Sequence, residues 1–330
     1  MRKIRIVSLL MAALCLLGTF VQAAGRIDLS KNPTLTLSYQ SGKTPLSGAS
    51  FEIFRVASVD ETGELHALAD FSSFDFGLRG ENDAAWRKLS FTLEAFVQRR
   101  DITPDDAGKT GKDGKLTFPT GEKNLKPGLY LVTGARHEQG GYYYDAEPFF
   151  VMLPTQDTQK NEWVYDAAAS VKYEKTPVPA DDETITRKVL KIWEDDGHET
   201  KRPQSVTVEL LKNGKLYDTV KLSAKNNWRY SWTDLDASAR WTLTERTVDG
   251  YTSSVSREGI TFVVTNTYKT DEKTPERPST PSTPSNPSSP ASSGRPTLPQ
   301  TGAVWWPVGL LAALGLVFLI AGALDRKRNV

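Results

Sequence analysis

The sequence has almost no cysteine. Cys15 is the only one in 330 residues, and it falls within an N-terminal segment that we expect to be removed. A mature chain without cysteine has no disulfide, no thiolate nucleophile and no cysteine-ligated metal. If the chain is exported, its robustness must come from another kind of bond.

Histidine is scarce as well, and no phosphate-binding loop is present. His66, His137 and His198 are far apart and show no metal-ligand spacing. The two Gly-Lys-Thr sequences, at 42–44 and 108–110, lack the first glycine of a phosphate-binding loop. We therefore predict no metal, no cofactor and no enzymatic activity.

The charge balance does not fit a nucleic-acid partner. The chain has 41 Lys and Arg against 40 Asp and Glu, a formal net charge of +1. Both ends are basic, so their removal would leave a mildly acidic protein. Such a protein lacks the positive surface of a nucleic-acid binder.

Residues 1–23 have the order of a secretory signal. Arg2, Lys3 and Arg5 precede an apolar run at 6–17, and small residues follow up to Ala23, where we expect cleavage. A membrane anchor is the alternative, but this run is too short to span a bilayer core of about 30 Å.

The C-terminal segment 298–330 combines a pentapeptide, an apolar span and a basic tail. Residues 303–324 carry no charge and are long enough to cross a membrane as a helix. The tail at 325–328 would hold the end in the cytoplasm. The pentapeptide is Leu298, Pro299, Gln300, Thr301 and Gly302.

This pentapeptide resembles the sorting signal of sortase substrates. The resemblance implies that a membrane transpeptidase cuts between Thr301 and Gly302 and joins the threonine to an amine of the peptidoglycan precursor. Sortase and that precursor are then partners. The mature protein would be secreted and covalently anchored to the cell wall, after a transient stay in the membrane.

The segment before the pentapeptide, 270–297, is rich in Pro, Ser and Thr. Prolines occur at every third position from Pro275 to Pro290. Polyproline II has three residues per turn, so these prolines would line one face of a stiff stalk. At ~3.1 Å per residue its reach would be roughly 85 Å. A disordered linker is the alternative.

Two globular segments, 26–176 and 184–269, precede the stalk, with a Pro-rich and acidic boundary at 177–183. In the second segment, Val206, Val208 and Leu210 alternate with polar residues, before an Asn-Gly turn. Short strands without a helix predict a β-sandwich.

Three strands of the second segment each place one polar residue among apolar ones on the same face. These residues are Lys191, Glu245 and Asn266. Burial favours a neutral amine on lysine and a neutral acid on glutamate. A neutral amine beside an asparagine amide, with an acid to transfer protons, can form an amide bond and release ammonia. The alternative is that all three residues lie at strand edges and face water.

The second segment resembles the collagen-adhesin B-type repeat, or CnaB domain. The motifs are KIWEDD (191–196), KRP (201–203), NW (227–228), WTDL (232–235), DGYT (249–252) and TNTY (265–268). The resemblance implies an immunoglobulin-like sandwich with an isopeptide bond between Lys191 and Asn266, assisted by Glu245. By analogy with disulfide loops, such a link would stabilise the fold by about 4–5 kcal/mol.

The first segment is predicted to be mixed. Apolar residues at Trp86, Leu89, Leu93, Phe96 and Val97 have helical spacing, with Asn82 or Asp83 as a cap, and form a core-facing stripe. The strand candidates are 35–39, 50–56, 128–133, 142–144, 149–153 and 164–173.

This segment resembles the N-terminal domain of Gram-positive pilins. The motifs are PLSGASFEIFRVA (45–57), LKPGLYLV (125–132), PFFVMLP (148–154) and WVYD (163–166). Such domains often end in Tyr-Pro-Lys, whose lysine accepts the threonine of a preceding subunit. Here the sequence is Tyr173-Glu174-Lys175, so Lys175 is the first candidate acceptor and Lys172 the second. Two solvated lysines at a strand end are the alternative.

The first strand of this segment has Ser38 and Tyr39 where a bond-forming lysine would lie. We therefore predict no isopeptide bond in the first sandwich.

Together these patterns predict a mostly β fold with two tandem immunoglobulin-like (CnaB/prealbumin-like) sandwiches, the first with a helical insertion. A Pro-rich stalk and a transmembrane sorting helix would follow. The predicted function is a basal or minor pilin that links a pilus, through a backbone pilin, to peptidoglycan. The alternative is a stand-alone adhesin that binds host matrix through 26–176. The ligand of such an adhesin and the position in the pilus, base or tip, stay open.

Overall fold

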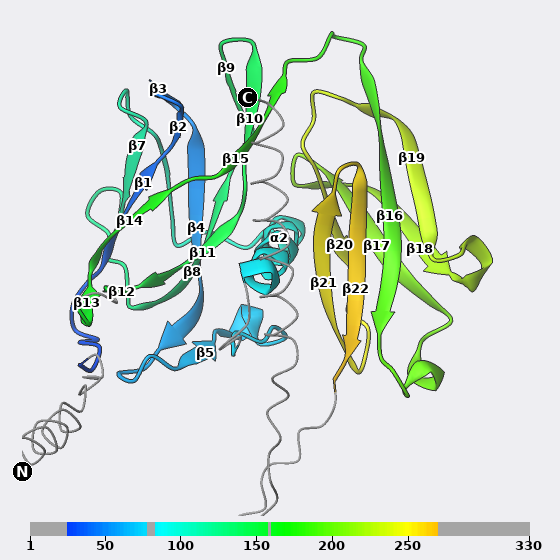
Figure 1. The fold of residues 1–330 in the computed structure, drawn as a ribbon, viewed down its shortest axis with the longest axis horizontal. Helices are drawn as coiled ribbons and strands as arrows, with labels where there is room; N and C mark the ends of the chain where they lie inside the picture. Colours follow the sequence, from blue (N-terminus) through cyan, green and yellow to red (C-terminus); the bar gives the residue numbers. More distant parts are fainter. Residues whose placement is uncertain (1–24, 78–82, 158–159, 270–330) are drawn as a thin grey trace, which may run out of the picture. The chain divides into compact units, whose positions relative to one another are not determined.

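The computed structural model describes residues 25–77, 83–157 and 160–269, all within one compact unit that ends at Asp271 (Figure 1). The predicted signal peptide, stalk, sorting motif and transmembrane segment lie outside the described residues. Within the described part, no helix is long and apolar enough to cross a membrane.

Among its described residues, the first sandwich contains fifteen strands in several small sheets. Its strands are β1 (Thr34–Ser38), β2 (Gln40–Ser41), β3 (Thr44–Pro45), β4 (Ser50–Val59), β5 (Leu65–Ala67), β6 (Asp106–Lys109), β7 (Lys115–Phe118), β8 (Gly128–Gly134), β9 (His137–Gln139), β10 (Tyr142–Ala146), β11 (Phe149–Leu153), β12 (Thr155–Asp157), β13 (Glu162–Val164), β14 (Asp166–Ser170) and β15 (Tyr173–Pro177). The main sheets have the orders β14-β1-β7, β15-β10-β9 and β11-β8-β4-β5, with β6 also paired to β4.

The sheet β11-β8-β4-β5 is covered on both faces. Along β4, Phe51 and Ile53 enter the core shared with β1 and β7, whereas Phe54 and Val56 pack on the opposite side. Successive side chains on a strand point to opposite faces. A strand covered on both sides is therefore buried throughout, as every residue of β8 is.

Helix α2 (Asp83–Arg100) covers the second face of this sheet. Leu93 and Val97 are buried there, together with Phe71 of the short 3-10 helix η1 (Ala69–Phe71). The predicted helical insertion and its core-facing stripe are thus confirmed. Of the two predicted caps, Asp83 is the first residue of the helix, and Asn82 lies outside the described residues.

The prediction of one strand at 164–173 is wrong. β14 pairs in parallel with β1, and β15 pairs antiparallel with β10 in a different sheet. Between them, Val171 is buried in the core and its N–H donates to the carbonyl of Ser38. The chain has to leave one sheet to enter the next, and the apolar pattern alone does not reveal that crossing.

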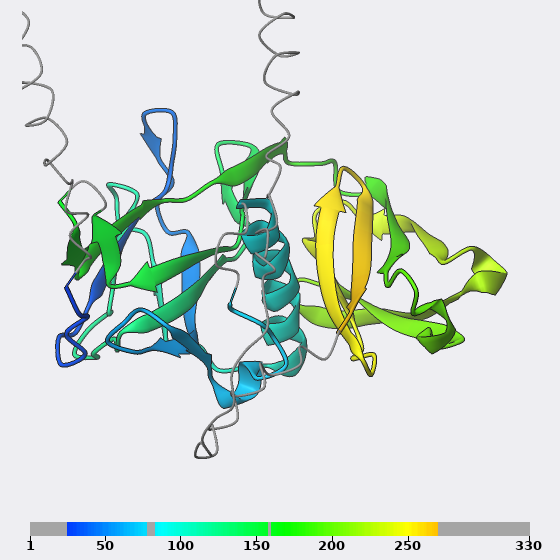
Figure 2. The same cartoon turned by 60° about the horizontal axis from the view of Figure 1, so that its bottom comes forward.

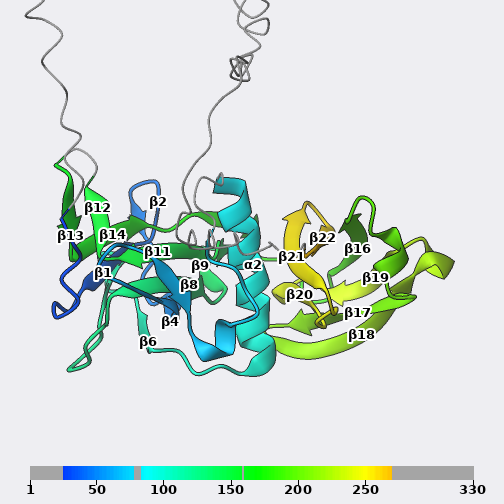
Figure 3. The same ribbon diagram turned by 90° about the horizontal axis from the view of Figure 1, so that it is seen from below.

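The second sandwich contains two sheets, of orders β19-β16-β22-β21 and β18-β17-β20 (Figure 3). Apolar side chains from both sheets meet in one core, which includes Val189, Leu210, Trp241 and Val264. The predicted sandwich is confirmed. The elements are β16 (Thr184–Glu194), β17 (Ser205–Lys212), β18 (Lys215–Ser223), β19 (Arg229–Asp236), β20 (Trp241–Glu245), β21 (Tyr251–Glu258), β22 (Thr261–Tyr268) and the 3-10 helices η2 (Glu199–Lys201) and η3 (Ala224–Asn226).

Helix α2 also contacts the second sandwich, along β20 and β21 (Figure 2). These are the outermost strands of their sheets. The buried N–H of Val255 donates to the hydroxyl of Thr92 at 2.8 Å, and the same hydroxyl donates to the Lys88 carbonyl at 2.7 Å. An edge strand leaves backbone groups unpaired. The helix of the first sandwich supplies one of the missing partners.

Arg240 forms a second contact with the helix. Its Nη2 lies 2.7 Å from Oε1 of Glu94, and its guanidinium also donates to the carbonyls of Gly134 and Ala146. Burial raises the pKa of Glu94, and the charge of Arg240 opposes the rise. A charge-assisted bond in this buried place joins residues that are far apart in the sequence.

We expect Thr92→Val to destabilise the protein by about 1–3 kcal/mol, because it leaves the buried N–H of Val255 without an acceptor. Thr92→Ser keeps the hydroxyl and serves as the matched control. Denaturant unfolding of the two variants measures the difference. Equal stability of the valine and serine variants would contradict the role given to this hydroxyl.

Candidate functional site

Three strands of the second sandwich bring Lys191, Glu245 and Asn266 together. β16 runs parallel to β22, with Lys191 opposite Val264 and Trp193 opposite Asn266. Lys191 is therefore the diagonal neighbour of Asn266 on the inner face of one sheet. Glu245 is the last residue of β20 and comes from the other sheet. The three residues predicted from alternation lie in one cluster.

The cluster is not accessible to solvent. The side chains of Lys191 and Glu245 are both 0% exposed, and Nζ lies 4.0 Å from Oε1 of the glutamate. Asn266 is 0% exposed as a residue. Nζ also donates to the carbonyl of Ile192 at 2.7 Å. The alternative of three edge residues facing water is excluded.

Burial governs the protonation of the pair. It lowers the pKa of Lys191 to about 8, although Glu245 and Asp195 act in the opposite direction. Burial likewise raises the pKa of Glu245, against the effect of the Lys191 charge. Both shifts favour the neutral forms, an amine and a carboxylic acid.

Several polar atoms of the cluster have no hydrogen-bond partner within the described part of the chain. They are both carboxyl oxygens of Glu245 and both side-chain polar atoms of Asn266. An unpaired buried polar group costs about 1–3 kcal/mol, so native proteins rarely keep one without a reason. Here the atoms belong to Glu245 and Asn266, two of the three groups that an amide-forming reaction requires.

The arrangement suits attack of the Lys191 amine on the side-chain carbonyl carbon of Asn266. The acid of Glu245 can donate to the amide oxygen and pass a proton to the departing nitrogen. The indole of Trp193, whose ring centroid is 4.0 Å from Nζ, covers the amine. Asp195 is neutralised by Arg202 and accepts a hydrogen bond from the Tyr251 hydroxyl.

The candidate acceptor lysines are not part of this cluster. Lys175 lies on β15, exposed, with its Nζ 3.9 Å from the ring centroid of Tyr142. Lys172 lies between β14 and β15 and lines a hollow of about 540 Å³ beside Trp86 and Phe150. Leu298 to Gly302 lie outside the described residues.

Ser38 and Tyr39, the residues at the expected lysine position of the first sandwich, lie at the end of β1 and directly after it. Tyr39 is fully buried, stacks edge-on against Phe51 and Tyr173, and its hydroxyl has no partner among the described atoms. Burial raises its pKa. The absence of an isopeptide bond in this sandwich stays a prediction.

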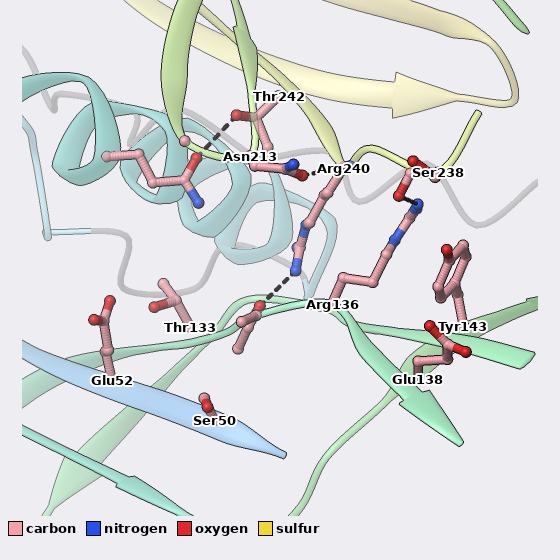
Figure 4. Close-up of a pocket in the computed structure, with 14 residues that line it drawn as sticks. Ser50, Glu52, Thr133, Arg136, Glu138, Tyr143, Asn213, Ser238, Arg240 and Thr242 are labelled. Atoms are coloured by element: carbon pink, nitrogen blue, oxygen red, sulfur yellow. Dashed lines mark hydrogen bonds between the residues drawn. The ribbon is translucent and has the colours of Figure 1, made fainter. Parts of the chain in front are cut away.

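A cavity of about 450 Å³ lies beside Arg240, between residues such as Glu52 and Thr242 (Figure 4). Its two arginines, Arg136 and Arg240, are engaged in internal contacts. Arg136 pairs with Asp145 at 2.6 Å and donates to the Ser238 carbonyl. This cavity shows no catalytic or ligand-binding arrangement comparable to the Lys191 cluster.

Sequence reasoning missed Ser253. This residue lies opposite Asn266, and its buried hydroxyl has no partner in the described part of the chain. The sequence carried a signal for Ser253, because it alternates with Tyr251 and Val255 along one strand. Both of these neighbours are buried.

Two families of surface-protein domains match the chain. Residues 187–267 match the Cna protein B-type domain. Residues 22–169 match the N-terminal domain of Gram-positive pilin subunit D1. The Cna B-type segment thus contains Lys191, Glu245 and Asn266, and the pilin-type segment contains helix α2.

One curated relative is the collagen adhesin of Staphylococcus aureus. It is 34% identical over 85 residues, which cover 24% of this chain and 7% of the adhesin. The chain thus matches only a small part of that protein. The chain contains one segment that matches a pilin-type domain and one that matches a Cna B-type domain.

Solved structures with related folds have low similarity. A single B repeat of the collagen-binding surface protein of Staphylococcus aureus is 19% identical, with a TM-score of 0.25, over 73% of this chain and 99% of that one. The SpaE basal pilin of Lactobacillus rhamnosus GG is 12% identical, with a TM-score of 0.30, over 68% and 83%. The major pilin SpaD of Corynebacterium diphtheriae is 17% identical, with a TM-score of 0.28, over 73% and 65%.

A variant without the Asn266 amide allows the Lys191 amine to be titrated. In Asn266→Ala, we expect a pKa near 8 in the folded chain and the ordinary 10.5 in the unfolded chain. The unfolded chain then binds the proton more tightly. The free energy of unfolding should therefore rise by about 3 kcal/mol as the pH rises from 8 to 10.5.

Denaturant titration across this pH window measures the rise. The double variant Lys191→Met, Asn266→Ala lacks the titrating amine and is the control. Parallel pH profiles for the single and double variants would contradict a lowered pKa at Lys191.

Proposed function

We propose that the protein is a wall-anchored structural subunit of a pilus whose second sandwich is locked by an amide bond between Lys191 and Asn266. The observation that carries this proposal is the fully buried cluster of Lys191, Glu245 and Asn266. A protein of this kind acts by the covalent links that it enters, not by turnover of a substrate.

The internal bond suits a subunit that bears tension. It joins β16, the first strand of the second sandwich, to β22, the last one. A tensile force applied at the two ends of this sandwich would be carried by the amide bond before it could separate the strands. The link also supplies the robustness that an exported chain without cysteine cannot obtain from disulfides.

Wall anchoring rests on the C-terminal sequence. LPQTG, the uncharged span and the basic tail occur in the order of a sorting signal. Sortase and the peptidoglycan precursor are the proposed partners, with Thr301 as the residue joined to the wall. The Pro-rich stretch at 270–297 would then carry the folded part outward from the wall.

The proposed position in the pilus is the base, where a minor pilin joins a backbone pilin to the wall. Lys175 is the proposed acceptor of the threonine of that pilin, and Lys172 the second candidate. The Nζ of Lys175 is exposed above the ring of Tyr142 and reaches solvent on an edge strand. An acyl-enzyme can reach an exposed amine, whereas it cannot reach the buried amine of Lys191.

A stand-alone adhesin is the second candidate function. The observation in its favour is the similarity to a collagen adhesin, so a host matrix protein is the proposed ligand in that case. A single wall-bound species that binds matrix protein, without high-mass ladders, would favour it over the pilus subunit.

The intact mass tests the internal bond. We expect the folded wild-type chain to weigh one ammonia less than its sequence, since amide formation expels the Asn266 nitrogen. Glu245→Ala should restore the full mass, because it removes the acid. Glu194→Ala changes an exposed carboxylate on β16 and should keep the deficit. Full mass in the wild type would exclude the bond.

Immunoblots of wall digests test the acceptor lysine. High-mass ladders that depend on sortase should contain this protein in the wild type and in Lys172→Ala. Lys175→Ala should leave only a lone wall-bound species, because anchoring through Thr301 needs no acceptor lysine. If Lys172→Ala lost the ladder instead, Lys172 would be assigned as the acceptor. Intact ladders in both variants would contradict an acceptor role for either lysine.

A further inference from the structure

Ser253 belongs to the same buried cluster as Lys191, Glu245 and Asn266. It lies on β21, directly opposite Asn266 on β22. Opposed residues of an antiparallel pair share a face of the sheet. Tyr251 and Val255, two positions to either side, are 3% and 4% exposed. Ser253 therefore points into the sandwich.

The Ser253 hydroxyl is buried and has no hydrogen-bond partner within the described residues. The Ser253 hydroxyl lowers the pKa of the Glu245 carboxyl, so the two groups lie side by side. Their atoms nevertheless lie outside hydrogen-bond geometry. The carboxyl oxygens also lack partners. A buried donor thus lies next to buried acceptors, an arrangement that favours a hydrogen bond between them.

We propose that Ser253 is a positioning residue for amide-bond formation, with its hydroxyl holding the Glu245 carboxyl against the side-chain amide of Asn266. The inference rests on the proposed bond between Lys191 and Asn266. It adds a fourth residue, from a strand that supplies none of the other three.

The reaction balances without any further reactant. The lone pair of the neutral Lys191 amine attacks Cγ of Asn266, so an Nζ–Cγ bond forms and the Cγ–Nδ2 bond breaks. One amine proton reaches Nδ2 through Glu245, and the nitrogen leaves as ammonia. Glu245 is protonated at the start and at the end. Ser253 donates its O–H to one carboxyl oxygen, so that the acidic proton on the other faces the amide.

The neighbouring Ser254 provides a matched control. It lies on the same strand, opposite Thr265, and points to the outer face of the sheet. One hydroxyl can therefore be removed from either face of β21. Only the hydroxyl on the inner face, that of Ser253, touches the cluster.

The test uses the full chain, recovered unreacted from inclusion bodies in denaturant and diluted into buffers from about pH 6 to about pH 9. Ammonia loss is followed over time by mass spectrometry of the folded fraction. The rate should rise with pH as Lys191 becomes neutral and fall again as Glu245 loses its proton, which gives a bell-shaped profile.

We expect Ser253→Ala to slow the reaction about tenfold, the effect of losing one hydrogen bond to the acid. The limb of the pH profile that Glu245 sets should move to higher pH, because the hydroxyl no longer stabilises the carboxylate and the pKa of Glu245 rises. Ser253→Thr should restore rate and profile, and Ser254→Ala should match the wild type.

Two results would overturn the role of Ser253 alone, provided that the wild type loses ammonia. One is an unchanged rate and profile in Ser253→Ala. The other is a slower rate with no movement of the limb that Glu245 sets and no rescue by threonine, which would indicate packing only. A wild type that never loses ammonia would instead overturn the bond itself.

Discussion

The burial of one lysine constrains the whole second sandwich. Lys191 occupies an inner position among Val189, Trp193 and Val264, where a charged ammonium has no water to solvate it. A buried charge without a close partner is costly, so the group shifts towards its neutral form. In the proposed bond, the same burial that would destabilise an inert lysine makes this one the nucleophile, with Asn266 as its target and Glu245 as the assisting acid.

The cluster could be predicted because its signal is local. Alternation along a strand assigns each residue to a face, and Lys191, Glu245 and Asn266 each share a face with apolar neighbours. Helix α2 was predictable for a similar reason, since its apolar residues repeat at helical spacing. Each of these inferences needs only a few consecutive residues.

Other features depend on which elements meet in space, and so the sequence pattern alone did not reveal them. Val255 and Thr92 are 163 residues apart, and nothing near either one indicates their hydrogen bond. The chain crosses from one sheet to another at Val171, because β14 and β15 belong to different sheets although the sequence pattern predicted one strand there. Ser253 is an intermediate case, because its face follows from alternation whereas its neighbours follow from the register with β22.

Helix α2 has consequences for how such proteins diversify. One side of the helix completes the core of the first sandwich, and the other side covers outer strands of the second. Exchange of the second sandwich for an unrelated one would leave Thr92 and Glu94 without their partners, and exchange of the first would leave the edge of β21 uncovered. The two sandwiches are therefore expected to be inherited as a pair, and changes along the helix to be matched by changes at β20 and β21.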